Sequence, residues 1–168
     1  MGTADESMRS SRLVFYKEDM ERIEKVLDLF LQSANAKCSL LVDKDGHLVT
    51  KRGESSSYDM DTISALVAGS FAATKQMAKL LGEEEFSVMF HQGKNDNIQL
   101  SLVGDRTILA VIFGEKTTLG MVRLYANQAS GKLGQLFRES RERKTAGEKI
   151  SQDFGKAAKG KLDDLFGG

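Results

Sequence analysis

The chain has 168 residues, enough for one domain with a hydrophobic core of its own. Its 24 basic and 24 acidic residues cancel, so the positive surplus that is typical of nucleic-acid-binding proteins is missing. No apolar run is long enough to cross a bilayer, and the polar N-terminus lacks the apolar core of a secretion signal. These features predict a cytoplasmic protein that neither binds nucleic acid nor inserts into a membrane.

The first half of the chain is predicted to contain a helix and a β-hairpin. Residues 1–15 are polar and are expected to form a flexible N-terminus. Apolar residues recur at intervals of three and four over 17–33, which predicts an amphipathic helix. Strands are expected at 38–43 and 47–52, because the Asp45-Gly46 pair between them is a favoured hairpin dipeptide.

The second half is predicted to add two helices and three strands. A long helix is expected at 59–81. Strands follow in quick succession at 85–91, 97–103 and 106–113, with glycine-containing turns between them. A third helix at 117–143 carries an apolar stripe. The links between neighbouring strands are short, which forces antiparallel pairing.

Two strands, 38–42 and 108–113, are apolar at nearly every position, so both should lie at the centre of a sheet that is covered on two sides. In 97–103, apolar and polar residues alternate, which is typical of a strand with one covered face. The order of elements is α-β-β-α-β-β-β-α. The predicted fold is therefore α/β (α+β), with a five-stranded antiparallel sheet, helices on both faces, and one domain over 16–143.

Residues 144–168 are predicted to form a flexible C-terminal tail with a short amphipathic segment. Its apolar residues could share one helical face, but Gly155 and Gly160 each cost a helix about 1 kcal/mol relative to alanine. Two interpretations stay open. One is a frayed tail, and the other is a segment that becomes ordered when its apolar side binds a partner.

The most informative surface is predicted on the helix at 59–81. We expect one side of it to pack on the sheet through Ile63, Leu66, Val67, Met77, Ala78 and Leu81. The opposite side should be charged, yet its middle turns carry Ala65, Ala68, Gly69, Ala72 and Ala73. Helix propensity alone would explain exposed alanines, but it would not select Gly69. A flat strip of small residues suits close approach by another helix or another protein.

The strand at 85–91 is predicted to lie at an edge of the sheet, because only one later strand can pair with it. A monomer would expose its apolar side chains, which include Phe86, Val88 and Phe90. Pairing with a second copy would cover them. We therefore predict a homodimer whose interface contains these three residues together with Ala68 and Ala72.

The sequence offers no arrangement that indicates catalysis, because no nucleophile is paired with a base. His47 and His91 lack partners at metal-binding spacing, and the turn at 43–46 does not fit a calcium loop. The segment 114–118 lacks the glycine spacing of a phosphate loop and fits a helix cap instead. Cys38 is the one cysteine, and its apolar surroundings favour a buried side chain over a reactive thiol. We predict a non-enzymatic protein without metal or cofactor.

Several segments of the chain are characteristic in combination. They are ANAK at 34–37, LVDKDG at 41–46, LVAG at 66–69, AKLLGE at 78–83, EF at 85–86, FHQG at 90–93, TLGMVRL at 118–124 and LDDLF at 162–166. Together with the order of elements, they resemble the roadblock/dynein light chain family and, within it, the bacterial MglB branch. The similarity extends over nearly the whole chain from about residue 14.

The resemblance implies a homodimeric regulator that binds a small Ras-like GTPase of the MglA type and stimulates its GTP hydrolysis. It also implies a role in cell polarity and motility, with the protein concentrated at a cell pole. The partner-binding residues that it implies are Ala65, Ala68, Gly69, Ala72, Ala73 and Gln76, with an accessory contact at Leu162, Leu165 and Phe166. At 74–76 this chain has Thr-Lys-Gln where related proteins have small or apolar residues, which bears on the choice of GTPase.

Two other functions stay open on the sequence alone. One is a roadblock-type dimeric scaffold with no effect on nucleotide hydrolysis, which a nucleotide turnover assay would separate from a regulator. The other is a sensor that holds a small ligand between sheet and helix, which an apolar pocket in the structure would favour.

Overall fold

A computed structural model describes residues 17–166 of the chain, so the flexible N-terminus predicted at 1–15 lies outside the described residues. The elements, in order, are α2 (Lys17–Ala34), β1 (Cys38–Asp43), β2 (Leu48–Gly53), α3 (Met60–Leu80), β3 (Val88–Gln92), β4 (Asn97–Val103), β5 (Thr107–Phe113) and α4 (Leu119–Phe166). This order is the predicted one. No helix of the described chain is long and apolar enough to span a membrane.

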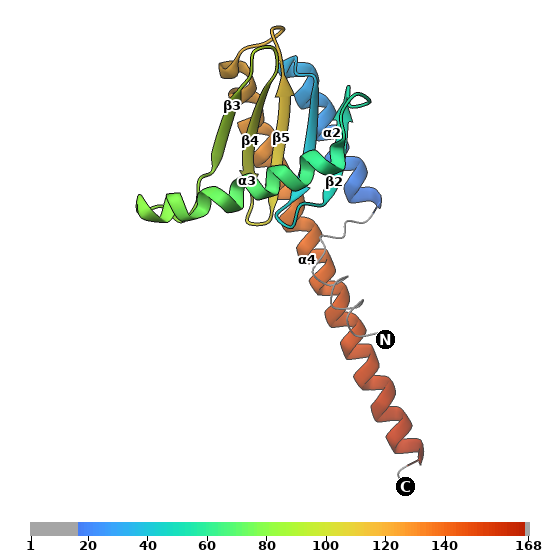
Figure 1. Ribbon diagram of the computed structural model, residues 1–168. Coiled ribbons are helices and arrows are strands. Elements are labelled where there is room, and N and C mark those ends of the chain that lie inside the picture. The colour runs from blue at the N-terminus through green and yellow to red at the C-terminus, as the bar shows by residue number, and fades with distance from the viewer. Residues whose placement is uncertain (1–16, 167–168) are drawn as a thin grey trace.

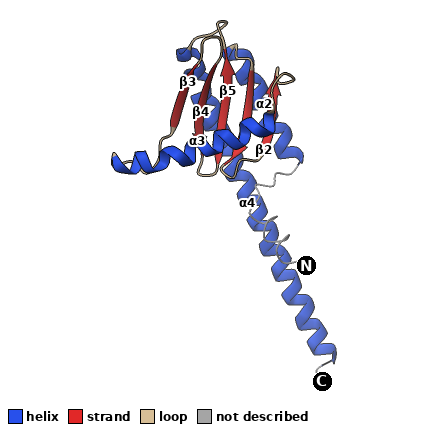
Figure 2. Cartoon of the chain, in the orientation of Figure 1, coloured by secondary structure: helices blue, strands red, loops and turns tan. Residues whose placement is uncertain are grey.

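The five strands form one antiparallel sheet in the order β2-β1-β5-β4-β3. Helices α2 and α4 cover one face of this sheet, and α3 alone covers the other (Figures 1 and 2). Every residue of β1 and β5 is buried, because both strands are central and both are covered on two sides. The predicted five-stranded antiparallel sheet with helices on both faces is confirmed.

The alternation of side chains along the central strands divides the core into two layers. Leu41, Leu109 and Val111 pack under α2 and α4, whereas Leu40 and Ile108 pack under α3. Cys38 belongs to the second layer and is fully buried, as expected. Burial raises the pKa of the Cys38 thiol to about 11, so the thiol stays protonated and unreactive near neutral pH.

Strand β4 is covered on both faces, although its alternation predicted only one. Ile98, Leu100 and Leu102 pack in the α3 layer as expected. The polar residues Gln99 and Ser101 are also buried, because α4 packs on β4 from the other side. The alternating pattern therefore reflects a polar layer beneath a helix and not a solvated face.

Helix α4 was predicted to end near residue 143, but it continues to Phe166. Its 48 residues make a rod of about 72 Å, and Figure 1 shows its second half leaving the domain. The chain contains no proline, and Gly155 and Gly160 are too weak a signal to stop a helix that is already formed. Every residue from 145 to 166 is exposed. The flexibility predicted for 144–168 stays a prediction.

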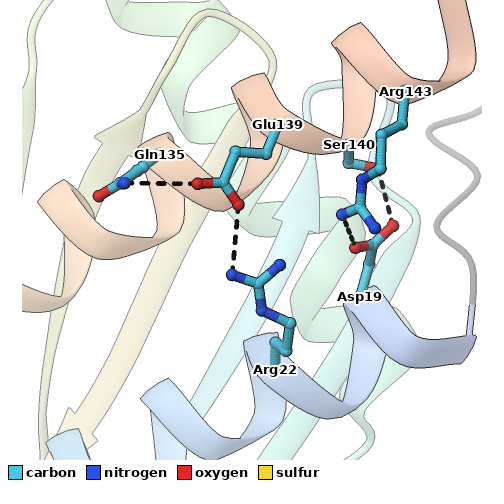
Figure 3. A network of polar contacts seen from close by, with 6 residues as sticks. All are labelled: Asp19, Arg22, Gln135, Glu139, Ser140 and Arg143. Carbon is cyan, nitrogen blue, oxygen red and sulfur yellow. Dashed lines mark hydrogen bonds and ion pairs between the residues drawn. The ribbon is translucent and has the colours of Figure 1, made fainter. Parts of the chain in front are cut away.

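A polar network joins the start of α2 to the point where α4 leaves the domain (Figure 3). Asp19, on α2, is buried, accepts a hydrogen bond of 3.1 Å from the Ser140 hydroxyl, and pairs with Arg143. Nearby, the exposed Arg22 guanidinium lies 3.2 Å from the Glu139 carboxylate. The network connects α2 to α4 at the point where α4 leaves the domain, because its members come from both helices.

Removing the cation from this network should destabilise the fold. Arg143→Ala leaves the buried Asp19 carboxylate with the Ser140 hydroxyl as its one side-chain partner among residues 17–166, and we expect a loss of about 2–3 kcal/mol in the free energy of unfolding. The matched variant Arg22→Ala removes an exposed ion pair and should cost about 0.5 kcal/mol or less. Urea unfolding followed by circular dichroism measures both losses. Equal losses in the two variants would mean that the buried Asp19 carboxylate does not depend on Arg143 for stability.

Candidate partner-binding surface

Helix α3 begins at a side-chain cap. The Asp59 carboxylate accepts hydrogen bonds from the Thr62 hydroxyl at 2.6 Å and from the Thr62 backbone N–H at 3.2 Å. These hydrogen bonds hold the pKa of Asp59 below its usual value. The hydroxyls of Ser64 and Ser70 donate to backbone carbonyls one turn earlier, so these polar residues are satisfied within the helix.

The face of α3 that packs on the sheet differs from the predicted one. Its buried residues are Met60, Ser64, Val67, Ala68, Phe71 and Ala78. Leu66, predicted to pack on the sheet, is 65% exposed, and Met77 and Leu81 are exposed as well. The prediction was right for Ile63, Val67 and Ala78, which pack inward. It was wrong for the other three residues, because large apolar residues occur on both sides of this helix. Phe71, which the predicted face omitted, lies in the core and sets the rotation of the helix.

Most of the predicted small-residue strip faces outward. Ala65, Gly69, Ala72, Ala73 and Gln76 are exposed, as expected for a surface that a partner could contact. A Cβ atom added at Gly69 would meet nothing within 4 Å, so the backbone there is open. Ala68 is the exception, because it is only 6% exposed. The predicted exposure of Ala68 was therefore wrong.

The turn between β1 and β2 explains why Ala68 is buried. Gly46, in this turn, has a φ of +92°, and a Cβ atom added there would lie 3.2 Å from the Ala65 Cα and 3.7 Å from the Ala68 Cβ. The turn thus rests on the first alanines of the strip, which must be small. The sequence predicted both the turn and the strip of alanines. It did not predict their contact, because the two segments lie about twenty residues apart in the chain.

The outward surface of α3 is more apolar than predicted. Leu66, Met77 and Leu80 are exposed beside Gly69 and Ala73, and Leu80 reaches 88% exposure. The C-terminal part of α3 also extends past β3, beyond the edge of the sheet (Figure 1). An apolar surface of this kind on a helix that projects from the domain is typical of an interaction site.

Charged groups border this surface at the β1–β2 turn. The Lys44 ammonium lies 3.1 Å from the Glu85 carboxylate and so ties the turn to the segment before β3. No partner at metal-binding spacing was predicted for His47, but its Nδ1 lies 3.4 Å from the Asp43 carboxylate. The ligand atoms of Asp43, Asp45 and His47 lie within 4.8 Å of one another. Asp43 also accepts a hydrogen bond from the His47 backbone N–H, so contacts within the turn account for its burial.

Strand β3 lies at the edge of the sheet, as predicted, but it begins at Val88 and not at residue 85. Val88 is exposed and lies in the strand, whereas Phe86 precedes it and is partly buried. The Phe90 ring stacks on Phe113 with 6.1 Å between centroids, so Phe90 contributes to the core. The expected apolar edge is thus narrower than predicted, and pairing with a second copy stays a prediction.

The comparison with known proteins agrees with this fold. Residues 22–113 match the model of the Roadblock/LC7 domain family. The chain belongs to the roadblock/LC7 family. It is similar to MglB from Myxococcus xanthus, at 41% identity and a TM-score of 0.71, and to the gliding protein MglB from Thermus thermophilus, at 34% and 0.72. The chain is also similar to an MglB structure with a tetrameric arrangement, at 32% identity and a TM-score of 0.73. Each comparison covers 76% of this chain and 96% of the other chain. The predicted resemblance to MglB is confirmed.

Helix α4 starts after the segment that matches the roadblock model. Its second half carries exposed apolar side chains at Ile150, Phe154, Leu162, Leu165 and Phe166. These include Leu162, Leu165 and Phe166, for which the family resemblance implies an accessory contact. The structure places them on a projecting helix, far along the chain from α3, so any shared partner would have to contact two separate elements.

Two glycine substitutions test the structure of this surface. Gly69→Ala should stabilise the fold by up to about 1 kcal/mol, because the site is open and alanine favours a helix. Gly46→Ala should cost more than about 1 kcal/mol, because the added methyl group meets α3 and the positive φ is strained. Melting temperatures of both variants provide the check. A loss at Gly69 would mean that its backbone is covered in solution.

Proposed function

We propose that this chain is a homodimeric, non-catalytic regulator that binds a small Ras-like GTPase of the MglA type and stimulates its GTP hydrolysis. The observation that carries the proposal is the exposed surface of α3 around Gly69, Ala72, Ala73 and Gln76, in a chain similar to MglB. The role in which it would act is the control of cell polarity and motility, from a position at a cell pole.

The chemistry of the α3 surface suits a flat contact with a folded partner. Gly69, Ala72 and Ala73 allow close approach of backbones, and the exposed Leu66 and Met77 add apolar area. Charged and polar residues border this area at Asp61, Lys75, Gln76 and Lys79. An apolar centre with a polar rim is the usual composition of a specific protein interface.

A second copy of the chain is the proposed partner at the edge strand. The outer side of β3 has no neighbouring strand in the described part of the chain, and Val88 is exposed on it. An unpaired edge favours pairing with another strand. The tetrameric arrangement of a related MglB adds support for self-association in this branch of the family.

The proposed mechanism needs no catalytic residue from this chain. Helix α3 contains no arginine, and Arg52 on β2 is held by Asp28 through two hydrogen bonds of 2.8 Å. Acceleration would therefore come from binding the hydrolysis-competent conformation of the GTPase more tightly than its resting conformation. A scaffold of the same family would dimerise and tether another molecule, with no effect on nucleotide hydrolysis.

A charged side chain in the α3 surface should abolish partner binding. Ala72→Arg places a long cation in a close contact, so we expect loss of binding and a return of turnover to the intrinsic rate of the GTPase. Ala146→Arg, at an exposed position on α4, is the matched control and should leave both unchanged. The measurements are co-elution and GTP turnover with the small GTPase that co-purifies from native cells. Binding by wild-type protein without acceleration would support the scaffold instead.

Single replacements of arginine test whether this chain supplies a catalytic group. An arginine finger is worth about 10³–10⁵ in rate. Arg52→Ala, Arg106→Ala and Arg123→Ala should each leave the maximal turnover at saturating regulator within about tenfold of wild type. A thousandfold loss with binding intact would assign a direct catalytic role to that arginine.

The projecting half of α4 should be dispensable for folding and dimerisation. Residues 147–166 are all exposed, so deletion of 147–168 should leave a folded dimer. Size exclusion with light scattering and the melting temperature test this expectation. A mass near 18.5 kDa for the full chain would contradict the homodimer. If the dimer survives, weaker effects on the GTPase would identify the accessory contact at Leu162, Leu165 and Phe166.

A further inference from the structure

A second candidate site lies on the opposite face of the sheet from α3. It is a pocket of about 360 Å³ between strands β3 and β4 and helix α4. Gln99, Ser101, Arg123, Asn127, Ser130 and Phe90 are among the residues that line it. Most of these side chains are polar, although the pocket adjoins the hydrophobic core.

The buried end of the pocket contains polar atoms without partners. Gln99 is only 2% exposed, and its Nε2 donates a hydrogen bond of 3.3 Å to the Ser101 hydroxyl. Its Oε1 has no hydrogen-bond partner in the described chain, and neither has the buried hydroxyl oxygen of Ser130. Exchanging the amide nitrogen and oxygen of Gln99 would still leave one amide atom unpartnered. Each unsatisfied buried group costs about 1–3 kcal/mol, which a bound molecule would offset.

The open end of the pocket carries a cation. Arg123 is exposed, and its guanidinium forms no ion pair or hydrogen bond with any described residue. Asn127, one turn further along α4, likewise has a free side-chain amide among the described residues. A guanidinium presents a rigid fork of donors that matches phosphate and carboxylate groups. The pocket therefore combines an anion-binding group outside with hydrogen-bonding groups inside.

We propose that this pocket binds a small hydroxylated organic anion, such as a phosphorylated polyol. Its anionic group pairs with Arg123, and its hydroxyl groups hydrogen-bond to Gln99, Asn127 and Ser130. Its carbon chain lies against Phe90. The site is separate from the α3 surface, so the proposal does not depend on GTPase binding.

Titration of the full ¹⁵N-labelled chain with sorbitol 6-phosphate tests the proposal. We expect saturable chemical-shift changes that centre on the amides of Ser101, Asn127 and Ser130. Arg123→Gln should weaken binding by about tenfold or more, as loss of a charge-assisted hydrogen bond predicts. Arg138→Gln, at an exposed position on the same helix outside the pocket, is the matched control and should change affinity by less than about twofold.

Two further variants test the buried end. Gln99→Met removes the amide at nearly constant volume, and Ser130→Ala removes the hydroxyl. Each should weaken the binding of sorbitol 6-phosphate by at least about threefold, and Ser130→Ala serves if Gln99→Met does not fold. Sorbitol alone and inorganic phosphate alone should each bind more weakly than sorbitol 6-phosphate.

Three results would overturn the proposal. Absence of saturable shifts would mean that the pocket holds only water or is filled by a second copy of the chain. Equal affinity for inorganic phosphate, unchanged by Ser130→Ala, would reduce the site to an exposed arginine that attracts anions. Shifts spread along the lysines of α4 would indicate unspecific binding of charge.

Discussion

The burial of β1 and β5 on both faces is the constraint on which the rest of the structure depends. Two fully apolar strands at the centre require helices on both sides of the sheet. Helices α2 and α4 together cover one face of the sheet, and α3 alone covers the other. Five strands span about 19 Å between their outer members, whereas a helix is about 10 Å wide. In the described part of the chain no second layer covers this single helix, so its outward side is left for solvent or another molecule.

Local patterns predicted the elements well, and contacts between distant segments account for what they missed. Alternation and the Asp45-Gly46 turn located the strands to within a few residues. The rotation of α3 could not be predicted, because Leu66 and Phe71 lie on different sides of the helix and only the tertiary fold decides between them. The burial of Ala68 depends on Gly46, which the sequence does not connect to α3. The length of α4 was underestimated because its glycines were given too much weight against a chain without proline.

Small residues on α3 therefore serve two purposes that sequence alone cannot separate. Ala65 and Ala68 make room for the β1–β2 turn, whereas Gly69, Ala72 and Ala73 leave the outward surface flat. Polar residues on β4 show the same ambiguity. Gln99 and Ser101 follow the pattern of a solvated strand, yet they lie beneath α4 beside a polar pocket. In both places, the meaning of a residue depends on which element packs above it.

The network around Asp19 marks the point on α4 beyond which the helix projects from the domain. Phe166 lies 23 residues beyond Arg143, so a continuous helix carries its apolar end about 35 Å past this anchor. A rigid spacer holds its far end at one distance, where a flexible linker of the same length would sample many. As long as the helix stays formed, the effective concentration of that end is high for a molecule at this distance and close to zero for one placed nearer. Unfolding of the helix around Gly155 and Gly160 would let the apolar end reach molecules at many distances, but with a lower effective concentration at each of them.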